Sequence, residues 1–199
     1  MVQLGVVKDA ETLASFLEQT VVPALERVEL PTVAHSYRAT LDDNLEQLCR
    51  IDELYGALKG TAELRQASVR IGQQRLAMLL QIMPHPFLQR VDEAQQAARL
   101  HAHSAVVFGV QAAVANVPID LALVAAYYQC LSPFLSASMK LIRIGQNACQ
   151  ALLARSMRGA PTVAGRARKV MLEDMGWFAP ALDIASARHE TAYTRLFIS

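Results

Sequence analysis

Apolar residues recur at three- and four-residue steps along the first half of the chain, which is the period of one face of an α-helix. After Asp9, which can cap a helix, this pattern predicts a helix over residues 9–29 with a kink at Pro23. Pro31 can occupy the first turn of a second helix, and the pattern predicts a third over residues 42–58. The first half therefore indicates consecutive amphipathic helices.

A further helix is predicted from Thr61 to about Leu80, because Gly60 precedes it and the sequence Pro84-His85-Pro86 stops it. Glu63 lies in its first turn, where an acidic side chain is favourable. The positions that we expect to face the core are Leu64, Ala67, Ile71, Met78 and Leu79.

The second half of the chain is more apolar. Residues 104–119 contain no Asp, Glu, Lys or Arg, and neither do residues 121–139. Each segment holds a proline near a natural break, and its small residues suit close helix packing. We therefore predict an all-α, single-domain helical bundle over residues 1–199, with apolar helices that begin at Pro118 and Pro133 at its centre.

The alternative is a helical membrane-associated protein that uses residues 104–139. The overall charge does not indicate an anionic membrane or a nucleic acid as partner, since 19 basic and 18 acidic residues give a net charge of +1. The cysteines have no C-x-x-C spacing and sit in apolar surroundings, which fits a reducing cytoplasm; they are Cys49, Cys130 and Cys149.

No phosphate-binding loop of the G-x-x-x-x-G-K-[ST] or G-x-G-x-x-G type occurs, and no G-x-S-x-G nucleophile elbow. The chain is therefore not expected to bind GTP, ATP or NAD by a standard loop, nor to be an enzyme. Paired acids are interpreted as helix caps or solvated faces rather than as acid–base pairs; they are Asp42-Asp43, Asp52-Glu53, Asp92-Glu93 and Glu173-Asp174.

The histidines do not predict a metal centre. His189-Glu190 begins a zinc motif of the H-E-x-x-H type, but Tyr193 stands where the second histidine would be. His101 and His103 are two residues apart, which on a helix points them about 200° from each other. We expect His103 to be a hydrogen-bonded histidine at a helix start, and rank a metal-dependent enzyme that uses these residues last.

Lys140 follows the charge-free segment and precedes Leu141-Ile142. It is either a lysine whose stem packs on the core while its head reaches water, or a cation that lines a polar path or meets a partner. Gly145 can allow close helix approach, and Gln146 is interpreted as a surface amide.

Three segments follow one another in the sequence: HSAVVFG at residues 103–109, LSASMKLIRIGQNACQ at 135–150 and FAPALDIASARHETAYTRLF at 178–197. In this order they resemble the UreF family of urease accessory proteins, and the likeness extends from Gly5 onward. The resemblance implies a non-catalytic, all-α, dimeric chaperone in the cytoplasm. It would join UreD, also called UreH, and the GTPase UreG in a complex that delivers nickel to apo-urease. Nickel would pass in transit, with no cofactor bound tightly.

The resemblance also implies where partners bind. Residues 178–199 would form a partner-binding tail that becomes ordered on meeting UreD, with Arg195, Leu196 and Phe197 contributing. Lys140 matches a basic residue tied to the fidelity of metal insertion. The residues implied as partner-binding are Lys140, Gly145, Gln146, Arg188, His189, Glu190, Tyr193, Arg195, Leu196 and Phe197.

One departure from the family pattern concerns the N-terminus. Family members usually begin with a segment that carries a P-x-G-x-F/Y-x-x-S-x-G-L-E-like motif, and residues 1–7 start after the point where it would end. We therefore expect this sequence to lack that segment, which would expose the apolar surface that its helix covers.

Overall fold

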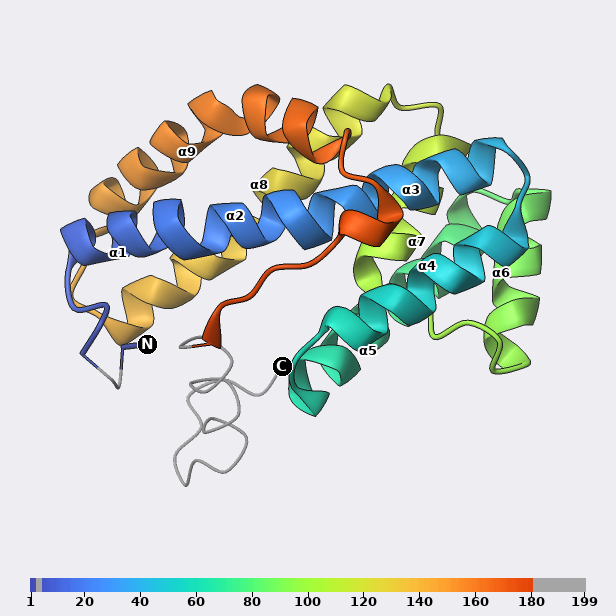
Figure 1. Cartoon of the computed structure of the whole chain (residues 1–199), viewed down its shortest axis with the longest axis horizontal. Coiled ribbons are helices and arrows are strands. Elements are labelled where there is room, and N and C mark those ends of the chain that lie inside the picture. Colours follow the sequence, from blue (N-terminus) through green and yellow to red (C-terminus); the bar gives the residue numbers. More distant parts are fainter. Residues whose placement is uncertain (3–4, 181–199) are drawn as a thin grey trace.

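The structure, a computed structural model, describes residues 1–2 and 5–180. Within these residues it is helical, without a strand, so the all-α prediction is confirmed (Figure 1). The elements in chain order are α1 (Ala10–Phe16), η1 (Leu17–Val21), α2 (Val22–Ala24), η2 (Leu25–Glu29), α3 (Leu30–Leu41), α4 (Leu45–Leu58), α5 (Ala62–Ile82), α6 (Pro86–Gln96), α7 (Ser104–Val114), α8 (Ile119–Leu141), α9 (Gln146–Ala167) and η3 (Leu172–Asp174).

The elements from α1 to α3 form one continuous rod (Figure 1). Asp9 caps it as predicted, since its side chain accepts a hydrogen bond from the Thr12 N–H at 2.9 Å. The expected break before Pro31 is wrong, because the chain stays helical through it. Pro31 has no N–H for the carbonyl of Arg27, four residues earlier, and this carbonyl instead accepts from Gly176 N–H at 3.2 Å.

Two stretches of the rod, η1 and η2, are π-helical. In each, a backbone N–H reaches back five residues, as Val22 does to the Leu17 carbonyl and Leu30 to the Leu25 carbonyl. A wider turn of this kind lets a helix continue where a proline interrupts the regular ladder. The rod thus includes both prolines, 23 and 31, without ending at either.

Helix α7 has no exposed residue and packs on α3 and α5. Its close approach to α3 depends on Gly109, because a Cβ there would lie 2.6 Å from the Val33 carbonyl oxygen. The apolar segment after His103 is therefore a buried helix, as its lack of charge predicted, although the prediction placed the helices from Pro118 and Pro133 at the centre.

Helix α8 differs from the prediction in two ways. It runs without a break through Pro133, so no helix begins there, and the proline removes one hydrogen bond of the ladder. It is also exposed along one face, although Leu123, Tyr127 and Leu131 lie in the core. By length and composition it is the one helix of the described residues that could cross a membrane, and 33% of its most apolar window is buried. A membrane span would remove these core side chains, so the membrane alternative is not supported.

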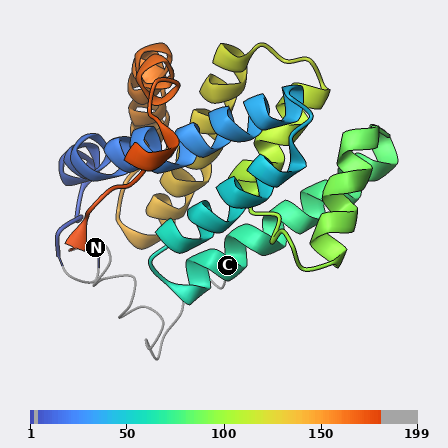
Figure 2. The same ribbon diagram turned by 45° about the vertical axis from the view of Figure 1, so that its right-hand side comes forward.

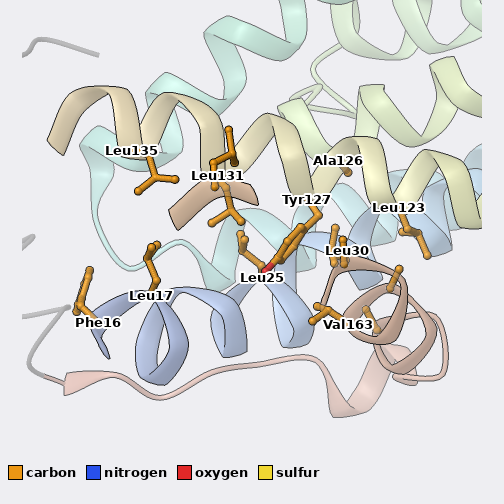
Figure 3. Close-up of a cluster of buried hydrophobic side chains, with 14 of the residues drawn as sticks. Phe16, Leu17, Leu25, Leu30, Leu123, Ala126, Tyr127, Leu131, Leu135 and Val163 are labelled. Carbon is orange, nitrogen blue, oxygen red and sulfur yellow. The ribbon is translucent and has the colours of Figure 1, made fainter. Parts of the chain in front are cut away.

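Buried apolar side chains form two clusters. The first joins the rod to α8 and α9, and Figure 3 shows its side chains from facing helices pointing toward one another. The second lies between α4, α5, α6 and α7. Helices α3 and α7 contribute to both clusters and so connect them, while α9 and α6 lie at opposite ends of the molecule (Figure 2). The single-domain assignment stays a prediction.

Helix α5 faces the core with residues other than those expected. Leu79 is buried as predicted, but Leu64, Ile71 and Met78 are exposed. The inward face combines two small residues with two leucines, because α5 packs closely against α7 and the segment before it. Its buried residues are Ser68, Gly72, Leu76 and Leu79.

Residues 168–176, which we call the strap, run back along the rod after α9 (Figure 1). Three of its carbonyls are bound by rod side chains: Arg38 donates to Arg168 O at 2.7 Å, the His35 ring bonds Val170 O at 2.9 Å, and Arg27 donates to Asp174 O at 2.9 Å. The strap thereby leads the chain toward the N-terminal end of the rod.

Candidate functional site

A buried carboxylate organises the junction between α4 and α7. Asp52 is 0% exposed, and its two oxygens accept hydrogen bonds from the backbone N–H groups of His101 at 2.6 Å and His103 at 2.8 Å. The prediction that Asp52 is solvated is wrong, whereas its neighbour Glu53 is exposed as expected. Asp52 lies four residues after Leu48 and three before Tyr55, so helical spacing places it on the apolar face of α4.

His103 is the next member of this group. Its ring is 2% exposed, its Nδ1 lies 3.2 Å from Ser68 Oγ, and it meets the Tyr55 ring edge-on with centroids 5.3 Å apart. Burial lowers the pKa of His103, and the nearby charge of Asp52 opposes this shift. The prediction of a hydrogen-bonded histidine at a helix start is confirmed, since His103 is the N-cap residue of α7.

Tyr55 extends the group to the rod. Its hydroxyl donates to Glu29 Oε2, and Lys59 Nζ forms an ion pair with the other oxygen of Glu29. The same ammonium lies 4.7 Å from the centroid of the Tyr55 ring. Burial and the Glu29 charge raise the pKa of Tyr55 well above its ordinary value, so the phenol stays a neutral donor.

We call these side chains the Asp52 cluster; its members are Glu29, Asp52, Tyr55, Lys59, Ser68 and His103. Their polar groups bind one another and the backbone, which connects the rod, α4, α5 and the start of α7. The rings of His101 and His103 lie 6.1 Å apart in a non-helical segment, so the expected helical separation of about 200° does not apply. No three His, Cys, Asp or Glu side chains of the described residues are arranged to hold a metal ion.

A pocket of ≈ 610 Å³ adjoins this cluster at Gly56. His103 Nε2 lies 2.8 Å from the position that a Cβ on Gly56 would occupy, so only glycine leaves room for the ring. The pocket also contains Arg65 and Arg70 on α5 and Glu53 on α4. Charges of both signs line it, and the Arg65 guanidinium already donates to the Lys59 carbonyl at 2.6 Å.

Three predicted partner-binding residues lie together at the turn between α8 and α9. Lys140 is exposed in the last turn of α8, where a cation is favourable, and Gln146 is exposed at the start of α9. Gly145 caps α9 with nothing within 4 Å of where its Cβ would be, so the expected close helix approach there is wrong. We call residues 140–146 the α8–α9 turn.

The remaining predicted site residues lie outside the described residues. They are Arg188, His189, Glu190, Tyr193, Arg195, Leu196 and Phe197. Of the predicted tail, the structure describes residues 178–180, and Phe178 is 82% exposed.

The fold and the cluster define an all-α protein whose buried polar groups hold helices together. The UreF family model matches residues 7–157. A urease accessory protein UreF of Xanthobacter autotrophicus is 31% identical over 198 residues, which cover 100% of this chain and 80% of that protein. The UreF of Azorhizobium caulinodans is 32% identical over 199 residues, which cover 99% of this chain and 84% of that protein. The UreF of a Nostoc species is 28% identical over 204 residues, which cover 100% of this chain and 85% of that protein. The chain belongs to the UreF family of urease accessory proteins.

Proposed function

We propose that this chain is a non-catalytic scaffold of urease maturation, which joins UreD (UreH) and the GTPase UreG for GTP-dependent insertion of nickel into apo-urease. The observation that carries the proposal is the family match over residues 7–157, together with relatives that span the whole chain and are named urease accessory proteins.

The division of labour follows from the sequence. The chain has no phosphate-binding loop, so the nucleotide chemistry belongs to another subunit. In this proposal nickel is cargo and the chain binds no cofactor tightly. The chain acts in the cytoplasm, does not bind nucleic acid or a membrane, and forms a homodimer.

Two surfaces serve the partners in this proposal. The α8–α9 turn offers Lys140, Gly145 and Gln146 on exposed positions, which supports a contact there. The tail, residues 178–199, supplies Arg188, His189, Glu190, Tyr193, Arg195, Leu196 and Phe197 as further contacts to UreD.

Co-expression of the 199-residue chain with UreD and UreG, followed by affinity pull-down and size-exclusion chromatography, tests this proposal. We expect a stable complex that is lost when the chain is truncated before Asp183. A matched control replaces Glu93, an exposed residue of α6, with alanine and should assemble normally. A folded chain that forms no complex, or that binds GTP tightly by itself, would contradict the proposal.

A further inference from the structure

A groove of ≈ 460 Å³ lies between α5 and α8, with α7 as its floor. Ile71 and Arg75 reach it from α5, Phe108 from α7, and Tyr128 and Gln129 from α8. We call it the Arg75 groove. Neither the α8–α9 turn nor residues 178–180 contribute to its lining.

Arg75 is a half-buried cation with neutral partners. Its guanidinium donates to the side-chain oxygens of Gln111 at 3.3 Å and Gln129 at 3.1 Å, and lies 5.0 Å from the centroid of the Phe108 ring. No carboxylate of residues 1–2 and 5–180 forms an ion pair with it. Burial lowers the pKa of Arg75, and no neighbouring charge offsets that shift. A partly desolvated cation of this kind gains more from an added carboxylate than an exposed one does.

The acid that lines this groove is already engaged. Glu29 borders the groove, but its two oxygens bind Tyr55 and Lys59. Within residues 1–2 and 5–180, therefore, no acid of the groove lining is available to pair with Arg75.

Exposed apolar side chains lie in and beside the groove: Ile71 and Tyr128 line it, and Leu64, Met78 and Leu121 lie beyond its lining on the same helix faces. On α5, Leu64, Ile71 and Met78 follow at seven-residue steps, so they share one helix face, and they are 46%, 52% and 47% exposed. On α8, Leu121 and Tyr128 show the same step and are 61% and 48% exposed. Apolar side chains gathered in this way around a groove are typical of a protein-binding surface.

A second copy of the chain does not satisfy this surface. A two-fold interface brings the same patch of both copies together. Such pairing would bring two Arg75 cations together, and neither copy has a free carboxylate in its groove to neutralise them. Charge complementarity therefore favours a different protein.

We propose that the Arg75 groove binds a segment of a partner protein that presents apolar side chains and one Asp or Glu, whose carboxylate pairs with Arg75. The inference rests on the proposed function, which supplies UreD and UreG as the partners. It adds a contact surface on the folded helices that does not depend on the tail.

The first test places a photo-crosslinking amino acid at Ile71 or at Tyr128 in the chain co-expressed with UreD and UreG. We expect a crosslink to one partner segment that contains an acidic residue, identified by mass spectrometry. The same amino acid at Glu93 on α6 is the control and should give no such crosslink. Crosslinks at residues 71 and 128 that reach only a second copy of the chain overturn the inference.

The second test measures affinity with Arg75→Gln, which keeps a polar side chain but removes the charge. We expect Arg75→Gln to bind the crosslinked partner at least tenfold more weakly than the native chain does. Arg75→Lys should have an affinity between those of the native chain and Arg75→Gln. Reversing the partner's acid to Lys, combined with Arg75→Glu, should restore binding. Arg70→Gln, an exposed arginine on the same helix, should leave affinity unchanged.

The outcomes separate the two proposals. A complex that assembles normally with Arg75→Gln and shows no crosslink at Ile71 or Tyr128 overturns this inference and leaves the scaffold proposal standing. A native chain that assembles with neither partner overturns the scaffold proposal, and this inference with it.

Discussion

The Asp52 cluster and the Arg75 groove both place charged side chains among apolar helices, but the two charges differ in burial and in the groups that bind them. Asp52 is fully buried and bound by two backbone N–H groups. Arg75 is half-buried and has two amide oxygens and a ring around it. The first arrangement is complete within the chain, whereas no carboxylate of the described residues pairs with the cation in the second.

The difference teaches how to separate structural from functional polar groups in this fold. A buried polar group whose bonds are all satisfied supports the native state, and its loss destabilises the protein. A half-buried charge without a counter-ion contributes little to stability. Mutations in the two regions should therefore divide into those that change folding and those that change binding.

The largest expected effect comes from Asp52→Ala. The substitution leaves the N–H groups of His101 and His103 buried without an acceptor, which costs about 3 kcal/mol. Urea unfolding followed by circular dichroism measures it. The matched control is Glu53→Ala, one residue along on the exposed side, which should stay within about 0.5 kcal/mol. Equal effects of the two substitutions would contradict the structural role of Asp52.

Gly56→Ala should have the next largest effect. The added Cβ would lie 2.8 Å from His103 Nε2, and overpacking of this kind costs about 1 to 3 kcal/mol. The control is Gly159→Ala on α9, where nothing lies within 4 Å of the added Cβ and helix propensity should stabilise by up to about 1 kcal/mol. Thermal unfolding of both variants tests the difference in sign, and a stabilised Gly56→Ala would refute it.

Acid should weaken the fold through His103. Burial lowers its pKa below the value of 6.5 that it has when unfolded. The unfolded chain thus binds more protons, so the stability that is present above pH 6.5 is lost as the pH falls through the folded pKa. The slope can reach about 1.4 kcal/mol per pH unit for one proton.

Urea titrations between pH 7.5 and pH 5 measure this slope, and His103→Gln should reduce it. Burial also lowers the pKa of His35, whose ring bonds the Val170 carbonyl of the strap, so His35→Gln should remove a further part of the slope of stability against pH. An unchanged slope in both variants would show that neither ring is buried in its neutral form.

The smallest effect on stability is expected for Arg75→Leu. The leucine fits an apolar groove and removes a cation that no carboxylate of residues 1–2 and 5–180 neutralises, so stability should change by less than about 1 kcal/mol in either direction. Urea unfolding measures it beside Asp52→Ala. A loss as large as that of Asp52→Ala would remove the distinction between the two regions.

Helix positions follow from the sequence where caps and prolines mark them. Asp9 and Thr61 cap α1 and α5 as their position predicts, and the Pro84-His85-Pro86 sequence separates α5 from α6. Prolines 31 and 133 were expected to mark helix starts, but tertiary packing and π turns carry the helices through them.

Burial is predicted less well than helix position. Leu64, Ile71 and Met78 form an apolar face of α5 that the periodicity assigns to the core, yet this face is exposed. Close packing selects the neighbouring face instead, where Gly72 lets α5 approach the segment before α7, because a Cβ there would lie 1.9 Å from the Ala102 carbonyl oxygen. Hydrophobicity alone cannot distinguish an apolar face that packs inside from one that remains exposed.

The Asp52 cluster was missed for a related reason. A charged residue is normally assigned to solvent, and the bonds that satisfy Asp52 come from backbone groups about 50 residues away. Its place on the apolar stripe of α4, between Leu48 and Tyr55, is the signal that sequence alone offers. Predictions for residues 181–199 lie outside the described residues.

The strap's resistance to a pulling force should depend on the direction of that force. The strap and the rod run antiparallel and are joined by a row of hydrogen bonds. Gly176 and Asp174 bond Arg27 at one end of the row, Val170 bonds His35, and Arg168 bonds Arg38 at the other end. A force on the last described residues that points away from the rod would load these bonds one at a time, as in peeling. A force along the rod would load them all together. The strap therefore yields to an outward pull and resists a lengthwise one.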